Sequence, residues 1–264
     1  MLDAPRLTVA RSAGTPMVQG RHTVSVMGTV VSFDLRDPVP SAALADAVRA
    51  LHRADELFST YKANSPISQL GRGEITFDQC PPDVVEVLNL CERATGWTDG
   101  YFDAYAGGRL DPSGLVKGWT IRQASDILCD AGSRHHSVNG GGDIQFVGGT
   151  QDGTPWRVGI ADPQKPDQLL AVLESAGGAI ATSGSAERGH HVTDPLGGQL
   201  ATYFLSVTIV SDSIIDADVI ATAAFARGES AVDWVCGLDG VEGLFLATSG
   251  HLVATTGLPL ARPD

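Results

Sequence analysis

The 264-residue sequence predicts an α+β fold with mixed, largely antiparallel sheets packed against helices. Short β-rich runs separated by Gly and Pro fill residues 137–210, and apolar residues recur at helical spacing before and after this region. Helices and strands alternate without the regular period of a doubly wound parallel sheet, which favours the α+β class. With 43% hydrophobic and 19% charged residues, the composition is that of a globular protein able to bury a core.

The elements can be assigned in chain order. Residues 1–20 mix polar residues, Gly and Pro without periodicity, which predicts an irregular lead-in. Residues 21–264 then form a single domain, with room for two subdomains. Residues 22–35 are rich in β-branched side chains and predict one long strand, in which Gly28 marks a bulge or a close approach of a ligand.

Helices and further strands follow from the same patterns. The expected helices are 41–57, 82–96, 116–132, 213–227 and 231–236. The expected strands are 137–139, 143–147, 156–160, 169–173, 179–182, 201–210, 243–247 and 251–255.

Charge and targeting signals exclude some classes of protein. The formal net charge of −13 disfavours nucleic-acid binding, and an anionic small ligand would need a local cation or local hydrogen-bond donors. No apolar stretch is long enough for a membrane span, and the first twenty residues lack the apolar core of a signal peptide. We therefore expect a cytoplasmic protein. The four cysteines are isolated in apolar helical patterns, which favours buried thiols over metal ligands or disulfides.

Asp218 and Thr222 are the first candidate site. On a helix, residues four apart point the same way, so this carboxylate and this hydroxyl offer two hard oxygens of the kind that Mg²⁺ prefers. Taken alone, such a pair is more often a local hydrogen bond or a solvated face. The apolar residues around Asp218 raise the weight of the metal interpretation, because a buried carboxylate needs a partner.

A turn that leads into a helix, Asp111–Gly118, is the second candidate. Unpaired N–H groups at a helix start attract phosphate, and Lys117 adds positive charge, although an ordinary capped helix with an exposed lysine fits as well. The glycine-rich stretches Asn139–Asp143 and Thr182–Ser185 fit either a close ligand or tight turns. The histidines of His190–Pro195 suit proton transfer, or a structural or exposed role.

Taken together and in order, these segments resemble the ApbE family of FAD:protein FMN transferases. The resemblance runs from Met27 to about Gly228. It rests on Met27–Thr29, Phe58–Tyr61, Ser68–Leu70, Gly100–Asp103, Leu110–Trp119, Asn139–Asp143, Ala181–Gly184, His191–Pro195, and Ala217–Asp218 with Ala221–Thr222.

The resemblance implies an ApbE-like, T-fold-related architecture and a set of site residues. FAD would be bound by Met27, Tyr61, Phe102, Asp103, Ala104, Asp111, Lys117 and Thr193. Mg²⁺ would be held by Asp218, Thr222 and the backbone carbonyl of Gly114. Asp218 and His191 would be the catalytic residues, with His191 as the base or proton shuttle.

The implied reaction is Mg²⁺-dependent transfer of FMN from FAD to a threonine or serine hydroxyl of an acceptor flavoprotein, with release of AMP. Two alternatives stay open: a pyrophosphatase that hydrolyses FAD to FMN and AMP, and a binding module that leaves FAD intact. Many members of the family are exported lipoproteins with a signal segment and a lipid-attachment cysteine, and because neither is recognisable in residues 1–20 we do not expect a periplasmic location here. Some members also have a polar residue at Ala221 or an acidic one at Lys117, so metal ligation here would lean more on water and backbone.

Overall fold

The computed structural model describes residues 15–149, 153–184 and 192–262. Its main element is an eight-stranded sheet of order β1-β2-β3-β4-β7-β8-β9-β10, in which every neighbouring pair is antiparallel. Its strands are β1 (Met17–Val26), β2 (Thr29–Pro40), β3 (His136–Gly140), β4 (Asp143–Val147), β7 (Gly178–Gly184), β8 (Phe204–Ser211), β9 (Glu242–Ala247) and β10 (Leu252–Ala254). A separate antiparallel ribbon consists of β5 (Trp156–Asp162) and β6 (Lys165–Ser175).

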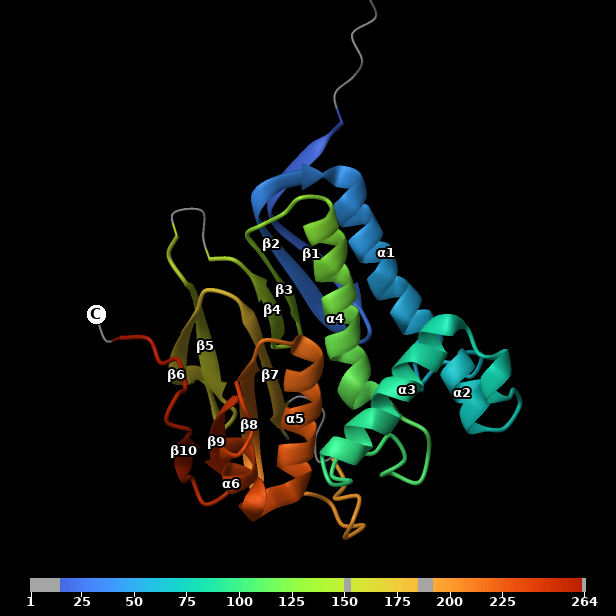
Figure 1. Cartoon of the computed structure of the whole chain (residues 1–264), viewed down its shortest axis with the longest axis vertical. Helices are drawn as coiled ribbons and strands as arrows, with labels where there is room; N and C mark the ends of the chain where they lie inside the picture. Colours follow the sequence, from blue (N-terminus) through green and yellow to red (C-terminus); the bar gives the residue numbers. More distant parts are fainter. Residues whose placement is uncertain (1–14, 150–152, 185–191, 263–264) are drawn as a thin grey trace, which may run out of the picture.

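Helices cover one face of this sheet, and the β5–β6 ribbon covers the other (Figure 1). The helices are α1 (Ser41–Phe58), α2 (Pro66–Gly71), α3 (Pro82–Trp97), α4 (Ser113–Asp130), α5 (Ile214–Arg227) and α6 (Ala231–Cys236), with 3-10 turns η1 (Phe77–Gln79) and η2 (Gly228–Ser230). Strand alternation explains the two faces. Ile144 and Phe146 of β4 pack on Trp156 of the ribbon, whereas Gln145 between them accepts the N–H of Ile214 at the start of α5. The α+β prediction is confirmed.

A second apolar core lies where the helices extend past the sheet (Figure 1). The end of α1, α3 and the first turns of α4 meet there, and the rings of Phe58 and Trp119 touch edge to face at 5.5 Å. Val219 on α5 belongs to the same cluster. This core fixes the beginning of α4 against α1, α3 and α5, and the candidate site depends on that placement.

The prediction for the N-terminal strand was wrong in two respects. Residues 22–35 belong to a hairpin of β1 and β2 and not to one strand, and β1 begins at Met17, before the expected strand start at residue 22 and within the expected irregular lead-in of residues 1–20. Met27 and Gly28 make the turn with φ of 54° and 71°, the left-handed pair that a two-residue hairpin requires. Gly28 suits this turn, but methionine rarely adopts such a φ, so Met27–Gly28 is a weaker turn signal than Asn-Gly.

Two further expectations can be compared with the structure. Each of the four cysteines is a free thiol, but only Cys91 is buried and Cys236 is exposed, so the expectation of buried thiols was too general. Burial raises the pKa of Cys91 to about 12. Within the described ranges, no helix is both long and apolar enough to cross a membrane.

A buried histidine joins α4 to the sheet. His136 on β3 is fully buried, with its Nε2 2.9 Å from the Ser125 hydroxyl of α4 and its Nδ1 2.9 Å from the Ser133 hydroxyl. Burial lowers the pKa of His136 to about 4, and the nearby carboxylates of Asp37 and Asp126 only partly oppose this. The folded protein therefore holds His136 neutral at pH values where an unfolded chain protonates it.

This pKa predicts acid-sensitive stability. The pKa is depressed in the folded state, so the contribution of His136 is fully present above about pH 6.5 and is lost as pH falls toward 4. Between pH 7.5 and pH 5 the loss should be about 2 kcal/mol. Urea unfolding at both pH values measures it, with His136→Gln as the comparison. A variant with the same pH slope as the wild type would contradict the assignment.

Candidate active site

Helices α4 and α5 approach each other closely through two glycines of α4. A Cβ at Gly118 would lie 2.6 Å from the carbonyl oxygen of Ile214 and 3.1 Å from Cβ of Asp218. A Cβ at Gly114 would lie 3.1 Å from Oγ1 of Thr222. Gly114 and Gly118 on α4 thus face Thr222 and Asp218 on α5, and each pair is four residues apart on its helix. At Gly118 only a hydrogen fits in place of a side chain, whereas at Gly114 a Cβ would be tight against the Thr222 side chain.

Asp218 is buried in this contact, with 4% of its surface exposed. Its Oδ2 accepts the N–H of Gly118 at 2.8 Å. In a regular helix that N–H donates to the carbonyl of Gly114, four residues earlier. The carboxylate of Asp218 therefore competes with the Gly114 carbonyl for the N–H of Gly118. This carbonyl oxygen is the one that the resemblance assigns to the metal.

Helix α4 begins at Ser113, three residues before the expected start, so Gly114 and Lys117 both lie on the helix. Lys117 Nζ is 2.7 Å from Oδ2 of Asp143, and Asp143 is fully buried at the start of β4. The other oxygen of Asp143 accepts the N–H of Thr182 on β7 at 3.0 Å. The lysine is thus held by the sheet and is not the exposed side chain that the ordinary-cap alternative requires.

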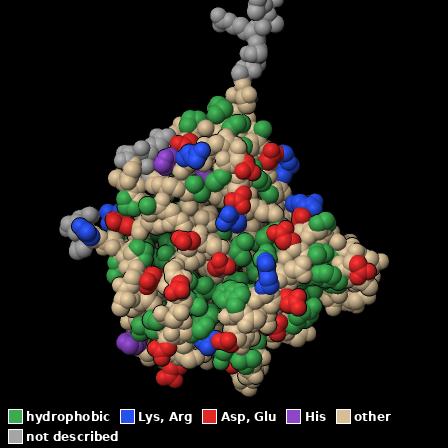
Figure 2. Space-filling view, in the orientation of Figure 1, with side chains coloured by type: hydrophobic (Ala, Val, Ile, Leu, Met, Phe, Trp, Pro, Cys, Tyr) green, Lys and Arg blue, Asp and Glu red, His purple; other side chains and the backbone are tan. Residues whose placement is uncertain are grey.

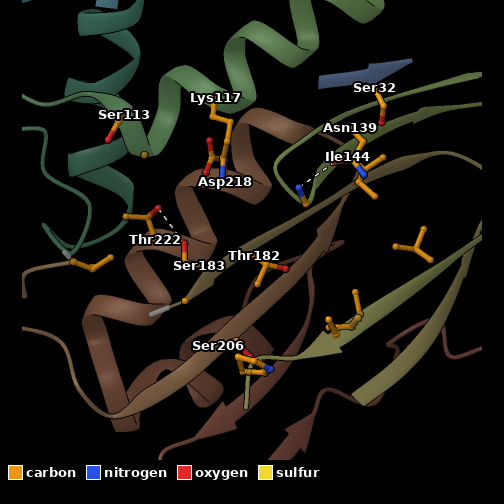
Figure 3. A pocket seen from close by; sticks show the side chains of 18 of the residues that line it. Ser32, Ser113, Lys117, Asn139, Ile144, Thr182, Ser183, Ser206, Asp218 and Thr222 are labelled. Atoms are coloured by element: carbon orange, nitrogen blue, oxygen red, sulfur yellow. Dashed lines mark hydrogen bonds between the residues drawn. The ribbon is translucent and has the colours of Figure 1, made fainter. Parts of the chain in front are cut away.

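The formal charges of this cluster matter for a ligand. Lys117 lies between two buried carboxylates, since it descends from α4 toward Asp218 on α5 (Figure 3) and contacts Asp143. Two carboxylates and one ammonium leave the cluster negative overall. Acidic side chains are also spread over the molecular surface in Figure 2. An anionic ligand at this position therefore needs a further cation.

Two hydroxyls lie beside Asp218. Thr222 is half-buried, and its Oγ1 is 3.4 Å from Oγ of Ser183 on β7 (Figure 3). Asp218, Thr222 and the Gly114 backbone together offer a carboxylate, a hydroxyl and a carbonyl across the α4–α5 contact. All are hard oxygen donors. Among the described residues no group of three or more His, Cys, Asp or Glu is arranged to hold a metal. Such a small donor set fits Mg²⁺, which keeps waters and binds substrate phosphates as well.

A cavity of about 1420 Å³ opens from this cluster and extends between the main sheet and the β5–β6 ribbon. Ligand pockets commonly have roughly 300–1,000 Å³, so this one has room for a dinucleotide. The predicted site residues that line it are Tyr61, Phe102, Asp103, Ala104, Asp111, Gly114, Lys117, Thr193, Asp218 and Thr222. The fold thus brings together residues from five separate parts of the sequence.

Met27 is not among the residues that line this cavity. Met27 occupies the β1–β2 turn and lines a neighbouring depression, which shares Ser32, Asn139 and Gly142 with the main cavity. A role for Met27 toward a ligand stays a prediction. His191 lies outside the described residues, so its role also stays a prediction.

Asp103 and Asp111 have local partners in the loop before α4. Asp111 accepts the N–H of Ser113 at 3.1 Å, and Asp103 accepts the N–H of Tyr105 at 2.9 Å. The N–H of Asp111 in turn donates to the carbonyl of Ala104 at 2.7 Å. These carboxylates shape the cavity wall. Tyr61 is different, because it lines the cavity and the residue is 96% exposed.

Sequence reasoning did not single out two residues of the site. Asp143 ends the glycine-rich stretch Asn139–Asp143, which fits either a close ligand or a tight turn, and its place at the start of an apolar strand signals a buried carboxylate that needs a partner. Ser183 belongs to the stretch Thr182–Ser185, for which the same two interpretations are open, and the structure places it on β7 beside Thr222.

The fold and the site together define an α+β protein with a dinucleotide-sized cavity that ends in a cluster of oxygen donors. The model of the ApbE family matches residues 27–109 and 104–245. The chain belongs to the ApbE family.

Curated relatives carry the name FAD:protein FMN transferase. The protein of Vibrio cholerae is 32% identical over 130 residues, which cover 46% of this chain and 39% of the relative. That of Rhodobacter capsulatus is 34% identical over 134 residues, 48% of this chain and 25% of the relative. That of Treponema pallidum is 30% identical over 177 residues, 59% of this chain and 48% of the relative. Each alignment therefore spans less than half of the relative's length.

Solved structures show the same fold. The ApbE protein of Thermotoga maritima has a TM-score of 0.78 at 19% identity, over 91% of this chain and 97% of that one. The flavin transferase ApbE of Vibrio cholerae has a TM-score of 0.73 at 21% identity, over 91% of this chain and 98% of that one. The ApbE-like architecture expected from the sequence is confirmed.

The α4–α5 contact predicts the effect of one methyl group. Gly118→Ala should destabilise the protein by about 2 kcal/mol, because its Cβ meets backbone and not a flexible side chain. Gly96→Ala is the matched control, since Gly96 is also helical but has open space around its Cβ position. Urea unfolding of both variants measures the difference. Equal stability of the two would show that α4 and α5 are not in such close contact.

Proposed function

We propose that the protein transfers the FMN half of FAD to a threonine or serine hydroxyl of an acceptor flavoprotein and releases AMP, in a Mg²⁺-dependent reaction. The observation that carries the proposal is the convergence of Asp218, Thr222 and Gly114 at one end of a cavity with room for FAD. The name of the curated relatives supports the same reaction.

In the proposed reaction, the acceptor hydroxyl oxygen attacks the phosphorus on the FMN side of the pyrophosphate. A new P–O bond joins FMN to the acceptor, the P–O bond to AMP breaks, and the hydroxyl proton passes to a base. Mg²⁺, when bound, would stabilise the negative charge on the phosphate oxygens and on departing AMP. We assign the base or proton shuttle to His191.

The residues of this chain would divide the work of holding FAD. Asp218, Thr222 and the Gly114 carbonyl would hold the cation, and Lys117 would approach the pyrophosphate while Asp143 fixes its ammonium group. Phe102 and Ala104 would form an apolar wall for the flavin. The exposed Tyr61 would stack on an aromatic ring of FAD, because stacking removes the apolar face of the tyrosine ring from water.

The proposed function also includes an acceptor protein and a location in the cell. The acceptor flavoprotein is inferred from the name of the relatives. A cytoplasmic location rests on the sequence, and cell fractionation followed by immunoblotting tests it.

A single substitution tests the metal site. Asp218→Asn keeps the shape and removes the charge, so the fold should survive while turnover falls by on the order of 100-fold and recovers partly in excess Mg²⁺. Thr222→Val should act in the same direction but more mildly, because a neutral oxygen contributes less. Asp216→Asn, an exposed position on the same helix, is the matched control and should change little.

Mass spectrometry of a candidate acceptor incubated with FAD and Mg²⁺ measures transfer, and calorimetry with FAD present measures Mg²⁺ binding separately. Wild-type turnover and unchanged Mg²⁺ dependence of Asp218→Asn would overturn the metal assignment. Release of free FMN and AMP would favour the pyrophosphatase alternative. Intact FAD after incubation with acceptors and Mg²⁺ would favour a binding module.

Ligand preference gives an independent prediction. FAD should bind more tightly than FMN in the presence of Mg²⁺, because the lysine and the cation both act on the pyrophosphate that FMN lacks. Isothermal titration with each flavin compares the two dissociation constants. Equal affinities would mean that the cavity recognises only the flavin and its first phosphate.

A further inference from the structure

Arg227, the last residue of α5, holds an unusual position between two aromatic rings. Its guanidinium carbon lies 4.3 Å from the ring centroid of Tyr101 and 4.6 Å from that of Trp234 on α6. The side chain is 13% exposed. A guanidinium this close to two ring faces, with little water around it, makes strong cation–π contacts.

The same guanidinium binds the segment that precedes Tyr101. Its Nη2 donates to Oδ2 of Asp99 at 2.8 Å and to the carbonyl of Thr98 at 3.3 Å. The Nε of Arg227 is buried without a hydrogen-bond partner among the described residues. An unsatisfied buried donor costs free energy, so the other contacts of the guanidinium must offset this cost. Stacking on the two rings and the hydrogen bonds to residues 98 and 99 therefore determine where the guanidinium lies.

The segment 98–104 has an internal anchor of its own. Thr98 is fully buried, and its hydroxyl donates to the carbonyl of Ala94 and accepts the N–H of Phe102 at 3.0 Å. Asp99 and Gly100 then adopt left-handed φ values of 56° and 81°. Asp is one of the few non-glycine residues that adopt this φ readily, and the Arg227 ion pair holds its side chain in place.

The segment carries much of the cavity wall. Tyr101, Phe102, Asp103 and Ala104 all line the cavity. The Phe102 ring lies 3.3 Å from the Cβ position of Gly114, directly beside Thr222. Arg227 and Thr222 are on the same helix, so Arg227 ties the flavin-facing wall to the helix that carries the metal-binding oxygens.

We propose that Arg227 is a positioning residue, which clamps segment 98–104 to the end of α5 and so fixes the wall against which the flavin of FAD binds. Arg227 itself is not among the residues that line the cavity, so it acts through Tyr101 and Phe102. The proposal rests on the proposed function for the identity of the ligand. It goes beyond that function because it assigns FAD affinity to a residue outside the binding site.

Such a clamp predicts a separation of binding from chemistry. Loss of the clamp should weaken FAD binding, because part of the binding free energy would then be used to order residues 98–104. The groups around Asp218 would not change, so the rate at saturating FAD should stay nearly the same. A merely structural role would give the opposite pattern, with fewer folded molecules and therefore a lower apparent kcat at an unchanged dissociation constant.

The experiment uses Arg227→Gln, with Arg122→Gln as the matched control because Arg122 forms an exposed ion pair with Asp126 on α4. We expect Arg227→Gln to raise the dissociation constant and KM for FAD about tenfold and to leave kcat at saturating FAD within about threefold. Hydrogen exchange of the ligand-free protein should be faster in residues 98–104. The control should match the wild type in all three measurements.

Asp99→Asn covers the case in which Arg227→Gln does not fold. Asp99 is 70% exposed, and Asn tolerates a left-handed φ, so this variant removes only the ion pair. It should raise the FAD dissociation constant about twofold to threefold, and faster exchange should be confined to the same segment.

Unchanged FAD affinity in both variants, or unchanged exchange in residues 98–104, would overturn the clamp. A fall in kcat without a change in affinity would overturn it as well. Failure of the wild type to bind FAD would contradict the proposed function instead. Hydrogen exchange of the ligand-free variants would then still decide whether Arg227 orders the segment.

Discussion

The close contact between α4 and α5 is the constraint on which the site depends. At Gly118 the backbones of the two helices come so near that no side chain fits between them, and the N–H of Gly118 donates to Asp218. One contact therefore buries the carboxylate, gives it a donor and turns the first turn of α4 toward Thr222. The apolar core shared by α1, α3 and α4 holds the helix start in this position.

Electrostatics follow from that geometry. Burying two carboxylates in one cluster is unfavourable unless each has partners, and here a lysine, two backbone N–H groups and the helix packing provide them. The carboxylates around Lys117 hold its ammonium group in place, but their negative charge weakens the attraction of this group for an anionic ligand. A divalent cation would restore that attraction, which is why the proposed ligand is a metal-bound pyrophosphate and not a free anion.

Local patterns in the sequence were sufficient to predict α1, α3, α4, α5 and α6, and the shared direction of Asp218 and Thr222 on α5, since both follow from a period of 3.6 residues. They did not predict the six-residue helix α2, which is too short to show that period. The β1–β2 turn was missed because its first residue, Met27, has a side chain that disfavours the conformation. The Lys117–Asp143 pair could not be derived from either segment alone. It depends on which strands become neighbours, and β4 pairs with β7 across an inserted ribbon that carries no signal of this register.

The inserted ribbon of β5 and β6 is a part of the cavity wall that can vary in sequence separately from the helices. Strands β5 and β6 pack on the sheet through their own apolar cluster and supply the cavity wall that lies opposite the helices. The oxygen donors all belong to α4, α5 and their contact with the main sheet. Altered length or side chains in the ribbon can therefore reshape the cavity without moving the oxygen donors. The shape of the cavity and the donor cluster can vary independently, because different parts of the chain encode them.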